Sequence, residues 1–197
     1  ALDDLIRQGK VRYIGTSTFA AWQVVESLWA SKELGLNRFV CEQPPYNLLD
    51  RRIERELLPF CRTYGLGVIP WAPIAGGLLS GKYRLGQPRP AGSRYEKGAF
   101  MNRDNDRALA RVEEYLKFCQ ERGYTPAHFA LAWCAAQPGI TAPIIGPRTM
   151  EQFEDYLKAL ELKVTEEDNR RINEICEPGT HVSMYYNANF GPNARWQ

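Results

Sequence analysis

The sequence predicts an α/β protein built from parallel strands with helices outside them. Short apolar runs alternate with longer segments that carry apolar residues at helical spacing. The connections are short, and strand–helix–strand units of this kind are right-handed and parallel. The 197 residues hold four such units. Because a complete eight-stranded barrel takes about 250 residues, the pattern fits half a barrel, although a four-stranded flavodoxin-like sheet would produce the same alternation.

Four apolar runs have the length of buried strands. They cover residues 11–15, 38–43, 67–71 and 143–146. The third run contains Pro70 near its carboxyl end, where a missing backbone donor is tolerable. A long segment over residues 75–103, rich in Gly, Pro and Arg, is predicted to be a loop.

Helices are predicted between and after these strands. The helix over residues 19–34 carries Trp22, Val25 and Trp29 on one face. Further helices are expected over residues 53–61, 109–119 and 126–137, from a capping box at Thr149–Gln152, and from about Thr165 to just before Pro178.

The first residues resemble the end of a helix that started earlier. Leu2, Leu5 and Ile6 have helical spacing, and Gly9 follows as a stop signal. The chain has neither an initiator Met nor a signal-peptide pattern. We therefore expect residue 1 to lie inside a longer protein.

Composition excludes several classes of function. The net charge is +2 with both signs mixed along the chain, so no basic stripe is available for nucleic acid or a membrane surface. No apolar stretch is long enough to span a bilayer. The five cysteines are scattered and form no CxxC pair, which argues against a disulfide framework or a metal site and favours a cytoplasmic location. His128 and His181 have no partners at ligand spacing, and we expect them to be structural or solvated.

Polar and small residues follow each predicted strand, where parallel α/β proteins bind ligands. The four ends are residues 15–18, 41–47, 71–77 and 146–149. They offer hydroxyls, an amide, a flat aromatic ring, a loop of small residues and a helix N-terminus. This set suits a nucleotide better than a metal ion or a proteolytic nucleophile.

The fourth end has the clearest physical basis for binding an anion. A strand that turns through Gly146 into a helix directs free N–H groups and a positive dipole end outward. Arg148 adds a fixed charge and a forked donor. The alternative is an ordinary capped helix with a solvated arginine.

The third end could approach a diphosphate closely. Residues 75–83 are small and glycine-rich, and Lys82 would supply the counter-charge, although the spacing is not that of a P-loop. The alternative is a flexible surface loop. Gln43 could bond an amide substituent or cap its own strand, and Trp71 could stack on a planar ring or belong to the core.

Taken in order, these segments resemble the aldo-keto reductases. The resemblance rests on residues 9–17, 43–49 and 71–83, and on residues 145–149 followed by Glu151 and Gln152. The likeness is closer to bacterial oxidoreductases related to potassium-channel β subunits. It covers residues 1–177 and leaves residues 178–197 as an irregular tail with Tyr185, Tyr186, Phe190 and Trp196.

The resemblance implies the C-terminal half, strands five to eight, of a (β/α)8 TIM barrel that binds NADPH/NADP+. Ser17 and Gln43 would hold the nicotinamide carboxamide, and Trp71 would pack on the ring. The expected cofactor-binding set is Ser17, Thr18, Gln43, Trp71, Ala72, Pro73, Ile74, Ala75, Gly76, Lys82, Arg94, Gly146, Arg148, Gln152 and Asp155. Of these, Arg94, Arg148, Gln152 and Asp155 would surround the 2′-phosphate and adenine. The chain departs from the family pattern at Thr18, where Asn or Arg is usual, and at Tyr156, where Asn commonly contacts adenine.

The implied reaction is hydride transfer from NADPH to the carbonyl of a small aldehyde or ketone. The family's catalytic Asp, Tyr, Lys and His lie on strands one to four, so we expect no catalytic residue in this chain and no turnover by it alone. Its open sheet edges predict self-association. Two alternatives stay open: a non-catalytic NADPH-binding regulatory protein of the channel β-subunit type, and a non-redox phosphate-binding α/β module.

Overall fold

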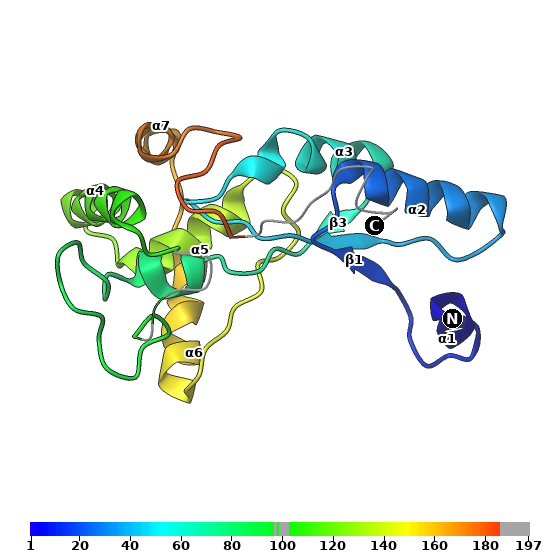
Figure 1. Ribbon diagram of the computed structural model, residues 1–197, viewed down its shortest axis with the longest axis horizontal. Coiled ribbons are helices and arrows are strands. Elements are labelled where there is room, and N and C mark those ends of the chain that lie inside the picture. The colour runs from blue at the N-terminus through cyan, green and yellow to red at the C-terminus, as the bar shows by residue number, and fades with distance from the viewer. Residues whose placement is uncertain (97, 99–102, 186–197) are drawn as a thin grey trace.

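The computed structural model describes residues 1–96, 98 and 103–185. Its centre is a parallel sheet of β1 (Gly15–Ser17), β2 (Cys41–Gln43) and β3 (Gly67–Val68), in the order β1-β2-β3 (Figure 1). Gly15 pairs with Cys41, and Cys41 pairs with Gly67. A flavodoxin-like sheet would place the first strand between the second and third. The observed order is instead that of successive strands in a barrel wall.

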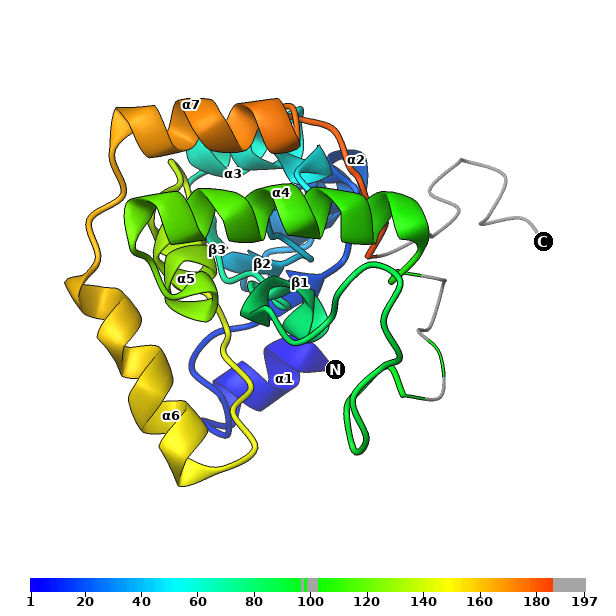
Figure 2. The ribbon, with the colours of Figure 1, turned by 90° about the vertical axis from the view of Figure 1, so that its left-hand side faces the viewer.

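Helices lie around the strands. They are α1 (Leu2–Arg7), α2 (Ala21–Glu33), α3 (Leu57–Tyr64), α4 (Asp106–Arg122), α5 (Pro126–Ala136), α6 (Met150–Leu157) and α7 (Glu166–Ile175), with short 3-10 turns η1 (Arg52–Glu54), η2 (Ala75–Ser80) and η4 (Lys158–Glu161). Figure 2 shows α4 and α7 side by side, with α5 and α6 beside them and α1 on the opposite side of the strands. The predicted parallel α/β architecture is therefore confirmed.

The core has two parts. The larger cluster gathers the buried faces of α4, α5 and α7 around Trp133 and Tyr46. The smaller cluster packs Val24 of α2 and Leu58 of α3 against Val68 of β3. The smaller cluster thus packs helices against a strand, whereas the larger cluster packs against residues that follow β3, among them Trp71 and Ile74.

The strands are shorter than the sequence predicts. The first spans Gly15–Ser17 rather than residues 11–15, because Val11 donates its N–H to Leu5 at the end of α1. The third is interrupted at Pro70, which has no N–H, although Trp71 still donates to Pro44 and pairs with Pro45 as an isolated bridge. The second spans Cys41–Gln43 of the expected residues 38–43.

The predicted fourth strand over residues 143–146 is wrong as a regular strand. Thr141 donates to Val68 and Ile144 donates to Pro70, so this segment does run beside β3. Prolines at 70, 143 and 147 remove the donors that a continuous ladder requires. The expectation that open sheet edges cause self-association stays a prediction.

The face assigned to α2 is also wrong. Ala21 and Val24 are buried against the sheet, whereas Val25 is 39% exposed and Trp29 is 59% exposed. Small and medium side chains suit the close approach of this helix to the strands, and the large indole lies on the outer surface. The other predicted helices are confirmed, except that the segment from Ile53 begins as the 3-10 turn η1 before α3.

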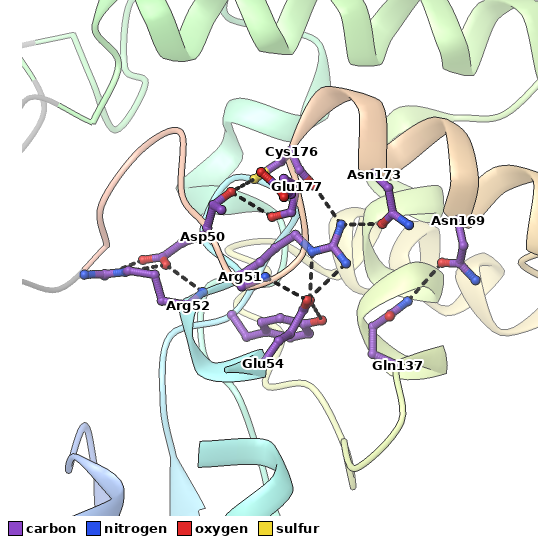
Figure 3. Close-up of polar contacts among 12 residues, drawn as sticks. Asp50, Arg51, Arg52, Glu54, Gln137, Asn169, Asn173, Cys176 and Glu177 are labelled. Carbon is purple, nitrogen blue, oxygen red and sulfur yellow. Dashed lines mark hydrogen bonds and ion pairs between the residues drawn. The ribbon is translucent and has the colours of Figure 1, made fainter. Parts of the chain in front are cut away.

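A buried polar cluster joins the segment after β2 to α7 (Figure 3). The Arg51 guanidinium donates to both carboxylate oxygens of Glu54, at 2.7 and 3.1 Å, and to Asn173 and the Cys176 carbonyl at 2.8 Å. Its carbon lies 5.2 Å from the Trp133 ring centroid. This cluster ties the C-terminal end of α7 to the segment that follows β2.

Replacing Arg51 with Met is expected to lower the free energy of unfolding by about 3 kcal/mol, because the Glu54 carboxylate, whose side chain is only 16% exposed, would lose its cationic partner and keep only the Tyr46 hydroxyl and the Gly179 N–H as donors. The Arg51 side chain is only 5% exposed. Arg84 pairs with Glu113 at the surface, where its side chain is 47% exposed, so Arg84→Met is expected to cost less than about 1 kcal/mol. Urea unfolding of both variants measures the difference, and equal losses would contradict this account.

Candidate nucleotide-binding site

The carboxyl ends of the three strands meet along one edge. Ser17 and Gln43 are register partners, and the Ser17 hydroxyl donates to the Gln43 carbonyl at 3.0 Å. Trp71 is tied to the end of β2 by its N–H, which donates to Pro44 at 2.9 Å, and by its carbonyl, which accepts from Tyr46. The predicted strand-end residues are therefore brought together.

A cavity of about 280 Å³ opens at the end of β3. Ten residues of the expected cofactor-binding set line it: Trp71, Ala72, Pro73, Ile74, Gly76, Lys82, Arg94, Gly146, Arg148 and Gln152. An aromatic ring, a loop of small residues and three cations thus face a single space.

The strand ends carry unusual backbone conformations. Among the described residues, the non-glycine residues with positive φ are Thr18 (59°), Ala72 (58°) and Ala75 (55°). All three follow a strand. Left-handed geometry is unfavourable for a residue with a side chain and is concentrated at functional sites. The conformational strain therefore lies where ligand binding is expected.

The loop after Ala75 stays left-handed at two glycines. Gly76 has φ 64° and Gly77 has φ 103°. A Cβ at Gly76 would collide with the Tyr95 hydroxyl, and one at Gly77 would lie 3.1 Å from Cε of Lys82. Gly76 thus has neither the conformation nor the space for a side chain, and Gly77 has a conformation that disfavours one, so this part of the cavity wall is backbone.

The opposite wall is the start of α6. Thr149 caps the helix by accepting from the Gln152 N–H at 3.3 Å. The predicted capping box is only half formed, because Gln152 Oε1 accepts from the Arg148 N–H at 2.8 Å instead of reaching back to Thr149. This bond fixes the backbone of Arg148 at the rim of the cavity.

Five residues of the expected set do not line the cavity. They are Ser17, Thr18, Gln43, Ala75 and Asp155. The first three lie farther along the same strand-end edge, and Ala75 is fully buried beneath the loop. Asp155 instead lies 3.0 Å from His128 Nε2 and 3.2 Å from Lys158 Nζ. The contact with His128, and then that with Lys158, lowers the pKa of Asp155.

Other lining residues were not in the expected set. They are Gly77, Ser80, Arg103, Leu131, Ile144, Ile145, Tyr156 and Tyr185. Gly77 and Ser80 belong to a loop already singled out, and Tyr156 occupies a position noted as a departure. Tyr185 belongs to the aromatic tail, for which no cofactor contact was predicted. Tyr186, Phe190 and Trp196 lie outside the described residues.

A buried carboxylate supports the first strand end. Glu42 of β2 is fully buried and accepts hydrogen bonds from the Thr16 hydroxyl and, at 3.0 Å, from the Phe19 N–H. Burial raises its pKa, although these hydrogen bonds oppose the shift. Glu42 therefore fixes the turn that contains Ser17 and Thr18.

The cysteines, the potential metal ligands and the apolar character of the helices also bear on the class of protein. All five cysteines are free thiols. Within the described ranges, no cluster of three potential metal ligands occurs, and no helix has both the length and the apolar character needed to cross a membrane.

The fold and the cavity define an α/β protein with barrel-type strand order and a ligand site at the strand carboxyl ends. The chain belongs to the aldo/keto reductase family, whose model matches residues 1–177. Membership implies a TIM barrel as the complete fold.

Proteins similar to this chain are named as oxidoreductases or as potassium channel subunits. An uncharacterized oxidoreductase of Bacillus subtilis, YrpG, is 42% identical over 94% of this chain and 56% of its own length. A probable voltage-gated potassium channel subunit beta of Oryza sativa is 36% identical over 82% of this chain and 51% of its own length. A putative aryl-alcohol dehydrogenase of Schizosaccharomyces pombe is 35% identical over 88% of this chain and 49% of its own length. The chain spans about half the length of these relatives.

Replacing Glu42 with Gln is expected to make the stability of the protein less dependent on pH. Since the folded-state pKa of Glu42 lies above its ordinary value of 4.5, its contribution is complete below that pH and is lost as pH rises through the folded pKa. The free energy of unfolding of E42Q relative to the wild type should therefore increase above about pH 4.5, by up to about 1.4 kcal/mol per pH unit. Urea unfolding between pH 4 and pH 8 measures this, and a difference that does not change with pH would contradict it.

Proposed function

We propose that this chain binds NADP(H) at its strand carboxyl ends and forms the cofactor-binding half, strands five to eight, of an aldo-keto reductase. The single cavity that Trp71, the Gly76 loop and Arg148 share is the observation that supports this most strongly. A flat ring, an open backbone and cations in that order match a nicotinamide, a diphosphate and a 2′-phosphate.

In this proposal each part of the cofactor meets a suitable group. The nicotinamide lies against Trp71, with its carboxamide toward Ser17 and Gln43. The diphosphate lies along residues 72–76, where Lys82 offsets its charge. The 2′-phosphate takes charge-assisted bonds from Arg94 and Arg148 beside the N-terminus of α6. Asp155 is now the least supported member of the set, because it is engaged by His128 and Lys158.

The bound cofactor would supply a hydride to a carbonyl carbon. The residues of this chain bind and orient it, and we propose that the proton donor comes from strands one to four of the complete barrel. The chain alone should then show no reduction of an aldehyde panel with NADPH. Robust turnover by the 197-residue chain would refute this division of labour.

The binding claim can be tested at Arg148. Arg148→Gln removes the charge but keeps a polar side chain, so NADP+ should bind about 10- to 100-fold more weakly while NAD+, which lacks the 2′-phosphate, is little changed. Isothermal titration of the 197-residue chain measures both affinities. Arg111→Gln, on the exposed face of α4, is the matched control and should leave both unchanged.

Other outcomes discriminate between functions. Equal weakening of NADP+ and NAD+ would reject the 2′-phosphate role. AMP or inorganic phosphate binding as tightly as NADP+ would favour a non-redox phosphate-binding module. The similarity to channel β subunits favours one further candidate, a regulatory protein, and NADPH binding without turnover by a complete barrel would support it.

A further inference from the structure

One backbone carbonyl beneath the cavity accepts from two buried hydroxyls. The Ala75 carbonyl is a hydrogen-bond acceptor for Tyr95, at 3.2 Å, and for Tyr185. Ala75 is fully buried and left-handed, and Gly76 and Gly77 continue the left-handed run. The two tyrosines therefore hold the residue at which the loop leaves ordinary geometry.

Tyr185 is itself firmly placed, although it lies 110 residues beyond Ala75. Its N–H donates to Asp50 at 2.9 Å, and its carbonyl accepts from Arg103. The Tyr185 ring meets the Trp71 ring edge-on, with 6.4 Å between their centroids. The Arg103 guanidinium carbon lies 4.6 Å from the centroid of the Tyr185 ring. The tail residue thus joins the segment after β2 to the loop after β3.

The chemistry of Tyr185 suits a permanent donor. The side chain is fully buried, and burial raises its pKa well above the ordinary value of 10.0. Burial thus keeps the hydroxyl in its protonated form, in which it can donate. An alanine keeps a left-handed conformation only where surrounding contacts hold it there. Here the hydroxyls of Tyr95 and Tyr185 supply those contacts.

We propose that Tyr185 is a positioning residue for the cofactor diphosphate: with Tyr95, it holds the Ala75 carbonyl so that the Ala75-Gly76-Gly77 backbone forms a fixed wall of the cavity. The proposal rests on the proposed NADP(H) site and adds a residue from the tail to it. Tyr185 acts through Ala75 and is not a catalytic residue. Loss of the Tyr185 hydroxyl should weaken the binding of ligands that reach the diphosphate loop and leave unchanged the binding of ligands that reach only Arg148.

The test compares Tyr185→Phe with a matched buried tyrosine. Tyr115 also donates its hydroxyl to a backbone carbonyl, that of Pro126, but it lies between α4 and α5, away from the cavity. The ligands are NADP+, which carries the diphosphate, and adenosine 2′-monophosphate, which has only the 2′-phosphate end. Binding is measured by isothermal titration of the 197-residue chain, and Tm is measured alongside.

We expect Y185F to bind NADP+ about three- to tenfold more weakly, the equivalent of one hydrogen bond, and to bind adenosine 2′-monophosphate as the wild type does. Y115F should lower Tm but leave both affinities unchanged. If Y185F does not fold, Tyr95→Phe removes the other hydroxyl and carries the same expectation.

Two results overturn the inference. The first is that Y185F and Y115F change NADP+ affinity alike, and the second is that both ligands weaken equally in Y185F. In either case wild-type binding would leave the proposed function intact. A wild-type chain that binds neither ligand would instead reject the proposed function, and the inference with it.

Discussion

Parallel pairing of consecutive strands is the constraint on which the site depends. Because β1, β2 and β3 run in the same direction and in chain order, their carboxyl ends lie at one edge. Ser17, Gln43 and Trp71, which are far apart in the sequence, become neighbours for that reason alone. If one strand were antiparallel, its carboxyl end would lie at the opposite end of the sheet.

The second requirement is that the strand ends turn sharply without filling the space above them. Thr18, Ala72 and Ala75 adopt left-handed geometry, and glycines at 76 and 77 continue it. A side chain at position 76 would collide with the Tyr95 hydroxyl. Such geometry costs free energy, which surrounding contacts must offset. Buried polar groups supply these contacts: Glu42 fixes the turn after β1, and the Tyr95 and Tyr185 hydroxyls fix the turn after β3.

The helices and several residues of the candidate site could be predicted from the sequence, because both depend on local residue patterns. Apolar spacing located the helices, and the ordered motifs placed Trp71, Gly76 and Arg148 on one site. Strand lengths could not be predicted from apolarity, since the prolines at 70 and 143 remove ladder donors from otherwise suitable runs.

The remaining differences depend on tertiary partners. On α2 the buried residues are Ala21 and Val24, whereas the larger Trp29 is exposed, so the size of the apolar side chains did not identify the face that packs. The contact of Asp155 with His128, and the hydrogen bond from Tyr185 to Ala75, join residues that are far apart in the chain. No periodicity or spacing encodes such contacts, so the position of Tyr185 at the cavity could not be predicted from the sequence.

The proposed site requires a single dinucleotide to span the strand ends from Trp71 to Arg148. A crystal structure of the chain with NADP+ would show whether one does. We expect the nicotinamide against Trp71, the diphosphate along the Gly76 backbone and the 2′-phosphate at Arg148. A dinucleotide bound elsewhere on the chain, or one that leaves the Gly76 loop untouched, would contradict the account.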